Sequence, residues 1–373
     1  MQKDRDLSFD AFRGLAIIAV VAIHAIYLGG SLKEATSLSY CQFLIFAVPA
    51  FLFMSGYWSS KENVRSLRSY RVFLSKRFSR ILIPYLFWSS ILIGYSLVRA
   101  RNIDGYKIIC TFLTGGASIG YYFIIVLAQL YILTPFLVYI NRKLNVYGLV
   151  LVILFNVMSL MILYFSRLLH VTVRIPLVLP FYSWIIYYEI GLYVGDRYNK
   201  VFISGKIRLS VLIATLLFGV LSAVEANFII SRYDNLTIAA MPIKYSSLLY
   251  SLCIIFLFLS AKEYFGRLSG VLTDIGYNSF GIYFIHIIVL NQLIRVFKGY
   301  EKTVLYQPLY QLLLVATTLF VCLVLIGIAR KLFPESFCVR ILGFGGHRRR
   351  LENVCKAIGQ SNKAKVGFGV EEM

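Results

Sequence analysis

The sequence predicts an all-α, polytopic membrane protein with about ten transmembrane helices and both termini in the cytoplasm. Three observations predict this class. Of the 373 residues, 59% are hydrophobic and only 15% are charged, whereas a soluble domain has about a quarter of its residues charged. The apolar residues form separate runs, each close to the length of a bilayer crossing. Lys and Arg gather in alternate connecting loops, as they do in proteins that obey the positive-inside rule.

Each predicted helix is an apolar run that approaches the about 20 residues needed to span a bilayer. The ten runs are 8–29, 41–59, 81–98, 121–140, 147–165, 177–195, 209–229, 246–261, 271–293 and 309–329. The ninth run is unusually polar, because it contains Asp274, Asn278 and His286. Residues 105–120 are rich in glycine and are expected to form a loop or an interfacial segment.

The distribution of basic residues predicts the orientation of these helices. With the N-terminus inside, the inner segments carry 26 of the 38 Lys and Arg residues and the outer loops carry 11, while Arg13 lies within the first helix. The loop 61–80 contributes most to this bias. We therefore expect one membrane domain over residues 1–330, followed by a basic, mobile cytoplasmic tail over 331–373.

The composition also excludes several classes of function. The net charge of +21 suits loops that face an anionic leaflet, so membrane lipids are expected partners and nucleic acid is not. The six cysteines form no CxxC pair, and no HExxH, His-rich or carboxylate cluster indicates a metal site. The first apolar run is longer than a signal-peptide core and is expected to remain as a helix.

The first helix carries the polar side chains that most need an explanation, because a charge within a bilayer costs a few kcal/mol. Asp10 precedes Arg13 by three residues, so the two can pair on one helix face. His24 follows Arg13 by eleven residues, which is almost three turns and about 16 Å along the same face. Two simpler interpretations remain: Arg13 snorkels toward water, and His24 makes a structural hydrogen bond to a neighbouring helix.

A second basic feature lies at the end of the loop 61–80. Arg77 and Arg80 are three residues apart and would share a helix face at the membrane surface, where two guanidinium groups can bind phosphate oxygens. Their alternative role is ordinary topology-setting charge. Pro84 is expected to kink or end the helix that follows.

Taken together, these pieces resemble the acyltransferase 3 family of integral membrane acyltransferases. Five stretches carry the resemblance in the family's order: 9-FDAFRGLAIIAVVAIH-24, 48-VPAFLFMSGY-57, 77-RFSRILIPYLFW-88, 122-YFIIVLAQLYILTPFL-137 and 275-IGYNSFGIYFIH-286. Tyr122 stands where the family usually has tryptophan. The tail matches nothing in the family, and the chain has no room for the extracytoplasmic SGNH domain that some members carry.

The resemblance implies transfer of an acyl group, usually acetyl, from cytoplasmic acyl-CoA to a hydroxyl of a glycan such as O-antigen or exopolysaccharide. It places the protein in the bacterial cytoplasmic (inner) membrane. Arg77 and Arg80 would bind the acyl-CoA donor. Arg13, oriented by Asp10, would either hold another part of the donor or orient the thioester for catalysis. His24 would either take the proton of the acceptor hydroxyl or become a covalent acyl-histidine carrier, and the sequence leaves both open.

Four further residues are candidates for the substrate site. Ser55 could donate a hydrogen bond to the oxyanion, although packing of a Ser-Gly pair is the favoured explanation. His286 is a partner of His24, part of the acceptor pocket, or a structural residue. Glu189 is a costly intramembrane charge that could pair with an arginine or line the acceptor tunnel. Tyr122 completes the predicted substrate-binding set.

A transporter or flippase for a lipid-linked sugar is the competing hypothesis, since it too needs many helices with buried charges. The chain shows no internal repeat, which is mild evidence against a secondary transporter. The expected partners are acyl-CoA, a glycan or lipid-linked sugar acceptor and lipids, and a homo-oligomer is compatible with the sequence. The two hypotheses differ in a simple test, because only an acyltransferase releases free CoA thiol from acetyl-CoA.

Overall fold

The computed structural model describes residues 6–29, 35–100, 104–168, 178–197, 205–267, 270–297 and 307–345. The described residues form helices and connecting turns, with no strand among them, which confirms the predicted all-α class. The elements are α1 (Leu7–Leu28), α2 (Ala35–Leu44), α3 (Ala47–Ser59), α4 (Leu67–Ala100), α5 (Gly105–Thr114), α6 (Tyr122–Leu144), α7 (Val146–Leu168), η1 (Phe181–Ser183), α8 (Ile185–Arg197), α9 (Gly205–Tyr233), α10 (Leu236–Ala240), α11 (Tyr245–Ser260), α12 (Lys262–Arg267), α13 (Val271–Tyr277), α14 (Ser279–Val296), α15 (Gln307–Leu332) and α16 (Glu335–Arg340).

Within the described ranges, nine helical segments are long and apolar enough to cross a membrane. They coincide with nine of the ten predicted runs, so the chain is a multi-pass integral membrane protein. Two of these segments are interrupted: α2 and α3 form one, and α10 and α11 form another. The ninth predicted run also divides, because α13 ends at Tyr277 and α14 alone is long enough to span.

The sixth predicted run, 177–195, differs from the expectation of a full crossing. Its described part consists of η1 and α8, and α8 has only 13 residues, which is short of the about 20 that a bilayer requires. Most of its side chains are buried by protein rather than exposed to lipid. The run is apolar because it lies inside the bundle, and hydropathy alone does not separate that case from a long span. The cytoplasmic placement of both termini remains a prediction.

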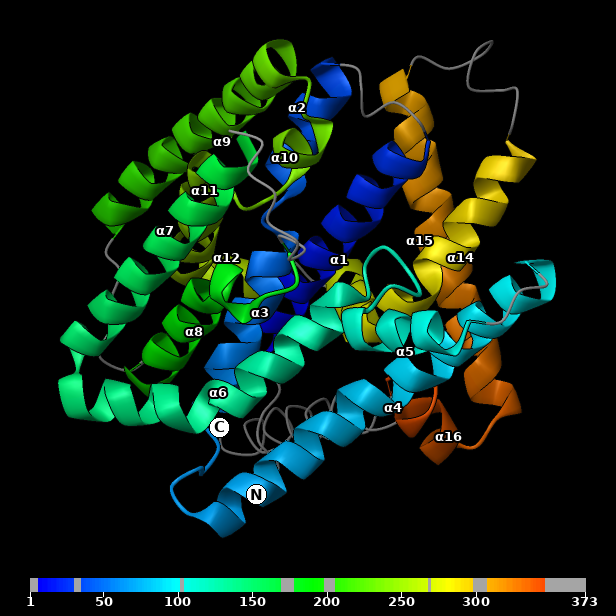
Figure 1. The fold of residues 1–373 in the computed structure, drawn as a ribbon, viewed down its shortest axis with the longest axis horizontal. Coiled ribbons are helices and arrows are strands. Elements are labelled where there is room, and N and C mark those ends of the chain that lie inside the picture. The colour runs from blue at the N-terminus through cyan, green and yellow to red at the C-terminus, as the bar shows by residue number, and fades with distance from the viewer. Residues whose placement is uncertain are drawn as a thin grey trace, which may run out of the picture.

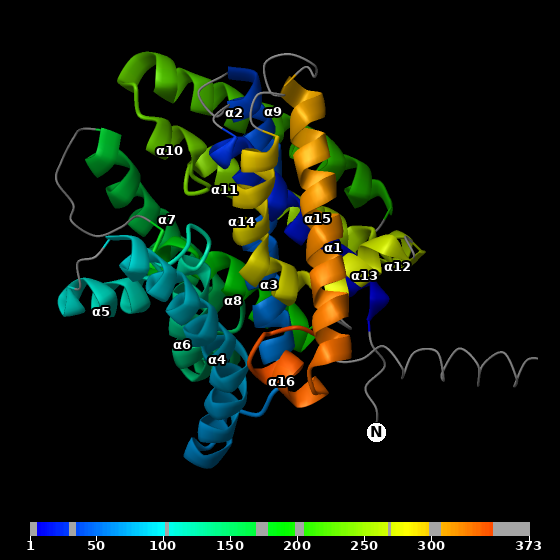
Figure 2. The ribbon, with the colours of Figure 1, turned by 90° about the vertical axis from the view of Figure 1, so that its right-hand side faces the viewer.

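Helix α1 occupies the centre of the bundle, where α3, α13, α14 and α15 pack around it (Figure 1). Figure 2 shows α1, α14 and α15 side by side. Glycine makes the closest of these contacts possible. A Cβ atom at Gly14 would collide with the carbonyl of Leu272 on α13, and one at Gly276 would collide with the carbonyl of Asp10. Close backbone contact therefore joins α1 to α13 on the side of α1 that carries Gly14.

Helix α3 packs on α8 in the same manner. A Cβ atom at Gly56 would meet the carbonyl of Tyr188, and one at Gly191 would meet the carbonyl of Phe53. Small residues allow helix backbones to approach closely in membranes, where packing rather than the hydrophobic effect drives association. This contact holds the short helix α8 inside the bundle.

The first part of the segment after α15 is packed against the membrane helices. Helix α15 continues to Leu332, and α16 and the residues that follow it fold back against the membrane domain. The side chains of Cys338, Leu342 and Phe344 are buried, and the indole N–H of Trp88 on α4 donates to the carbonyl of Leu342 at 3.1 Å. Residues 331–345 thus belong to the folded domain, and the rest of the predicted tail lies outside the described residues.

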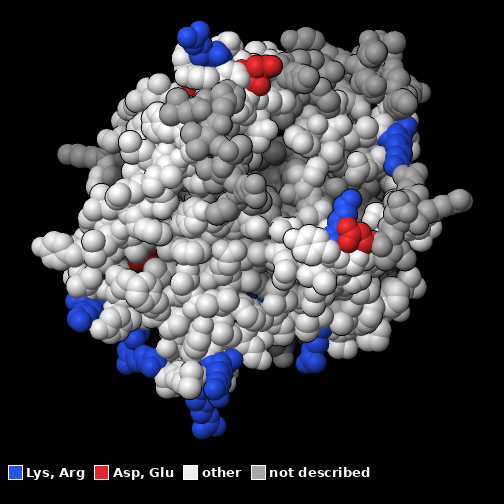
Figure 3. All heavy atoms as spheres, in the orientation of Figure 1, with Lys and Arg blue, Asp and Glu red and all other residues white. Residues whose placement is uncertain are grey.

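Many of the Lys and Arg side chains visible in Figure 3 lie along the lower edge of the molecule, where α4 begins and α6 ends in Figure 1, and others lie at the top and on the right-hand side. The middle of this face is almost free of charge. This separation is the pattern expected when lipid surrounds the white belt and the basic edge faces an anionic leaflet.

Candidate active site

The structure brings together two histidines that are far apart in the sequence. Nδ1 of His24, on α1, lies 2.9 Å from Nε2 of His286, on α14. The two ring centroids are 5.1 Å apart. His286 is 1% exposed, whereas His24 is partly exposed. We call these two residues the histidine pair.

The buried member of the histidine pair is also bound to its own helix. Nδ1 of His286 lies 3.0 Å from the carbonyl oxygen of Ile282 and 2.8 Å from that of Tyr283. Both ring nitrogens of His286 therefore have partners. Within the described residues, the contact with His286 is the one hydrogen bond made by His24, so its Nε2 remains open. An anchored imidazole with one open nitrogen is the arrangement that a general base or a nucleophile needs.

The glycine-rich loop between α5 and α6 lies beside the pair. The hydroxyl of Tyr283 donates to the carbonyl of Gly120 at 2.8 Å, and that of Tyr121 donates to the carbonyl of Phe284 at 3.0 Å. A Cβ atom at Gly120 would lie 3.6 Å from Cε1 of His24. These residues were not singled out from the sequence. The glycine run in 115–120 and the tyrosine three residues before His286 were the signals that could have identified them.

The N-terminal part of α1 carries the predicted ion pair. Nη1 of Arg13 lies 3.3 Å from Oδ1 of Asp10. The Asp10 side chain is 4% exposed and that of Arg13 is 33% exposed, so the carboxylate holds a guanidinium that still reaches the surface. Helix α1 runs without interruption from Leu7 to Leu28. Arg13 and His24 therefore lie almost three turns apart on one continuous helix, about 16 Å along its axis.

Arg77 and Arg80, both on α4, have different surroundings. The guanidinium of Arg77 donates to the carbonyl of Trp58 at 3.3 Å and pairs with Glu62 at 3.6 Å. It also packs against the rings of Phe73 and Tyr131, each 5.5 Å from its central carbon. Arg80 is exposed. Of these two arginines, Arg80 therefore presents its guanidinium to solvent, whereas that of Arg77 is held by protein.

Helix α4 passes through Pro84 without a break in its helical residues. The expectation that Pro84 would end the helix is wrong, and Arg77, Arg80 and the membrane span belong to one continuous helix. Prolines are tolerated within membrane helices because neighbouring groups bind the freed backbone carbonyl.

The other three predicted substrate residues lie on helices other than those that carry the histidine pair. Ser55 is half-buried on α3, Tyr122 stacks on Trp184 with centroids 6.2 Å apart, and Glu189 is fully buried on α8. In the described part of the chain, no hydrogen bond or ring contact links any of them to His24 or His286. The packing role considered for Ser55 agrees with its position beside Gly56, which contacts α8.

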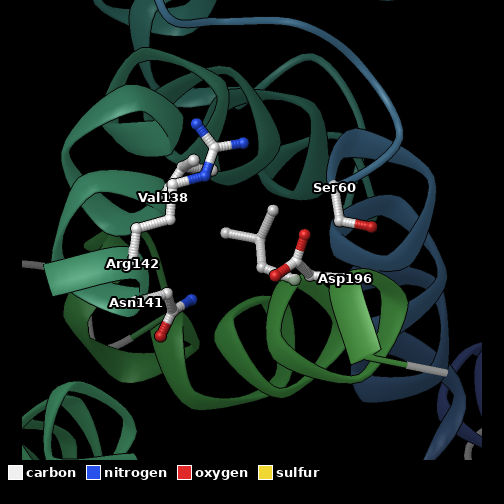
Figure 4. Close-up of a pocket in the computed structure, with 6 residues that line it drawn as sticks. Ser60, Val138, Asn141, Arg142 and Asp196 are labelled. Atoms are coloured by element: carbon white, nitrogen blue, oxygen red, sulfur yellow. The ribbon is translucent and has the colours of Figure 1, made fainter. Parts of the chain in front are cut away.

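Glu189 has an unusual environment for a carboxyl group. Among the described residues, neither of its oxygens has a hydrogen-bond partner of good geometry, and its polar neighbours are Asn141 and Arg197. Nearby, Asn141 and Arg142 of α6 face Ser60 and Asp196 across a small cavity (Figure 4). The cavity volume is about 10 Å³, which holds one water molecule at most. This region is therefore too small to hold a substrate.

A larger hollow of about 340 Å³ opens between α2 and α9. Its lining comprises Ala35, Thr36, Ser39, Tyr40, Phe43 and Asn227. None of the residues predicted from the sequence lines it. Among the described residues, no group of three His, Cys, Asp or Glu side chains is arranged to hold a metal ion.

Comparison with known proteins adds one finding. Residues 6–327 match the model of the acyltransferase 3 family, whose description is acyltransferase domain. The match begins just before α1 and ends within α15, so it covers both members of the histidine pair. No curated protein and no solved structure matches the chain.

Proposed function

Because the chain belongs to the acyltransferase 3 family, we propose that it is an O-acyltransferase of the bacterial cytoplasmic membrane that moves acetyl from acetyl-CoA to a hydroxyl of a surface glycan. The observation that carries this proposal is the histidine pair. A partly exposed imidazole is held on α1 by a buried partner on α14. A membrane helix keeps such a group at a cost, because polar side chains in lipid are expensive.

The donor side of the proposal rests on the basic residues at one edge of the bundle. Coenzyme A carries a pyrophosphate and a further phosphate, and these groups need exposed cations. Arg80 on α4 is exposed, and Arg13 presents a partly exposed guanidinium beside Asp10. An extended pantetheine arm can bridge the about 16 Å that separate Arg13 from His24 along α1. The thioester would then reach the open Nε2 of His24.

The transfer itself follows from this placement. The acceptor oxygen forms a bond to the thioester carbonyl carbon while its proton passes to Nε2 of His24. The carbon–sulfur bond then breaks, and the CoA thiolate leaves and receives that proton. In the covalent alternative, Nε2 attacks the thioester carbon first, the carbon–sulfur bond breaks and CoA leaves as the thiolate. The acceptor hydroxyl then attacks the acyl-imidazole, the carbon–Nε2 bond breaks, and the hydroxyl proton passes through the imidazole to the thiolate. Both routes need the same unprotonated nitrogen.

Thiol release tests the proposal. Purified protein in detergent, supplied with acetyl-CoA and a deacetylated glycan, is expected to release CoA thiol in proportion to acetyl ester formed. His24→Asn is expected to reduce this rate by about 10³-fold, because general base catalysis contributes factors of this size. The elution volume and thermal unfolding midpoint of the variant serve as controls for folding. A protein that moves a lipid-linked sugar between leaflets without releasing thiol would instead be a flippase, and the proposal would fail.

Mass spectrometry of surface glycans from cells with and without the gene identifies the acceptor. We expect the cells that lack the gene to lose the mass of one acetyl group for each modified sugar. Restoring the gene with the His24→Asn change should leave the glycan unmodified. Glycans of equal mass in all strains would place the acceptor outside the surface polysaccharides.

A further inference from the structure

The hydrogen bonds of the histidine pair determine where its protons lie. Nδ1 of His286 faces two carbonyl oxygens, those of Ile282 and Tyr283. A carbonyl oxygen can only accept, so this nitrogen must carry a proton. In a neutral imidazole the other nitrogen then bears a lone pair. Nε2 of His286 is therefore an acceptor, and it points at His24.

The proton on His24 follows from that assignment. Nδ1 of His24 is 2.9 Å from the lone pair of His286 Nε2, so it is the donor. Its own Nε2 then carries no proton and is free to accept one. The reverse order would have His286 donate to His24 and would leave a bare Nδ1 facing two carbonyl oxygens. That arrangement is costly, because His286 is 1% exposed and water cannot replace the lost hydrogen bonds.

Helix α14 itself fixes which histidine of the pair donates and which accepts. The two carbonyls belong to residues four and three positions before His286 in α14, so helix geometry alone brings them to Nδ1. The same turn is bound to the neighbouring loop, since the Tyr283 hydroxyl donates to the carbonyl of Gly120. The orientation of the His286 ring is thus set before any substrate arrives.

We propose that His286 is a positioning residue that holds His24 in the tautomer with a proton on Nδ1, leaving Nε2 to take the acceptor proton or the acyl group. This inference rests on the proposed function for its consequence, but the tautomer is a property of the resting protein. An exposed histidine side chain mostly carries its proton on Nε2, and in that form the open nitrogen of His24 would be neither base nor nucleophile, while its lone pair would face His286. His286 also continues to accept the Nδ1 proton when Nε2 becomes protonated, which stabilises the imidazolium.

Nitrogen NMR measures the tautomer directly. The chain has four histidines, so labelling histidine with ¹⁵N in a His170→Gln, His347→Gln background leaves signals from the pair alone. We expect two protonated and two unprotonated ring nitrogens, with His24 protonated at Nδ1. In His286→Leu the His24 signals are expected to move toward the form protonated at Nε2. A native His24 protonated at Nε2 overturns the proposal, whatever the activity of the protein.

Two substitutions at His286 separate positioning from packing. Glutamine can place an acceptor oxygen near the site of Nε2, whereas leucine fills similar space without one. We expect His286→Leu to lower kcat by about 10²-fold with KM for acetyl-CoA unchanged within about twofold, since a histidine in the wrong tautomer loses catalysis rather than binding. His286→Gln is expected to recover most of the lost kcat. Equal loss in both variants, or none in His286→Leu, overturns the proposal.

The same measurements distinguish this inference from the proposed function. If the wild-type protein releases no CoA thiol but shows the predicted nitrogen signals, the acyltransferase assignment fails and the tautomer assignment is supported. If it transfers acetyl while His24 is protonated at Nε2, the function is supported and the role of His286 fails. Thermal unfolding of each variant confirms that the signals come from folded protein.

Discussion

Two buried polar clusters lie among the membrane helices, and they differ in whether their hydrogen bonding is complete. In the first, Nζ of Lys244 donates to Oε1 of Gln42 at 2.8 Å and to the carbonyls of Ala239 and Met241 at 3.0 and 2.9 Å. Lysine has three protons to donate, so all are used, and its side chain is 0% exposed. We call Lys244 and these acceptors the lysine cluster. In the histidine pair, by contrast, one nitrogen of His24 stays open and partly exposed.

This difference indicates that the lysine cluster stabilises the fold and that the histidine pair is available for a reaction. The lysine cluster joins α2 to the junction of α10 and α11, and Glu225 of α9 lies near it, bound by Tyr164 and Ser246. A polar group buried in an apolar environment stabilises the fold when every donor and acceptor is matched. A nitrogen left open beside a glycine loop adds nothing to that stability, so its presence requires another reason.

The largest expected effect that tests this comparison is on stability. Lys244→Met is expected to lower the free energy of unfolding by about 3 kcal/mol, because it removes the three hydrogen bonds that the buried Nζ donates, about 1 kcal/mol each. The kcat of the protein that remains folded should stay unchanged. Thermal unfolding in detergent and CoA thiol release measure the two quantities. Loss of kcat with an unchanged unfolding midpoint would contradict the structural role of the cluster.

A matched control is Lys262→Met, which changes the same residue type outside the lysine cluster. Lys262 pairs with Asp6 at 2.6 Å, and both side chains are about a fifth exposed or more. Because water reaches both groups, we expect the pair to contribute about 1 kcal/mol. The Lys262→Met change should therefore lower the unfolding midpoint much less than Lys244→Met.

Arg77 and Arg80 of α4 offer a second comparison between a residue held by protein and a residue that is open to solvent. We expect the effects of their substitution to be of intermediate size. Arg80 has no hydrogen bond or ion pair among the described residues, so Arg80→Ala should raise KM for acetyl-CoA about tenfold and leave the unfolding midpoint unchanged. Arg77 is bound to Trp58 and Glu62. Arg77→Ala should lower stability by about 1–2 kcal/mol through those lost contacts. Steady-state kinetics and thermal unfolding of both variants measure these two effects. A raised KM in Arg77→Ala with a loss of stability in Arg80→Ala would contradict the prediction.

The smallest expected effect concerns Glu189. Its carboxyl group is fully buried, and neither oxygen has a hydrogen-bond partner of good geometry among the described residues. Oδ1 of the neighbouring Asn141 is also buried without a partner. The amide of Glu189→Gln adds a donor for that oxygen and removes a charge, so we expect a gain in stability of about 1 kcal/mol with kcat unchanged. A loss of kcat without a loss of stability would instead support the predicted role of Glu189 in binding the substrate.

Local features of the site could be predicted from the sequence. The ion pair between Asp10 and Arg13 was predictable because residues three apart on a helix are neighbours whatever the rest of the fold does. The polar stripe of α1 followed from helix periodicity in the same way. The surroundings of Arg77 were not predictable, since Trp58 and Tyr131 lie on other helices and their approach depends on packing.

The sequence by itself determined the class of the protein, because hydropathy sums along the chain and nine apolar runs of sufficient length are visible in the described residues without any knowledge of their neighbours. The sequence also showed that His24 is a polar side chain within a membrane helix, where its burial in lipid would cost free energy. Only the tertiary structure decided that His286, 262 residues away, would be its partner, that α8 would be a short buried helix, and that residues 331–345 would fold against α4. These outcomes depend on contacts between helices that are distant in the sequence. The periodicity of one helix shows which of its side chains share a face, but not which other helix packs against that face.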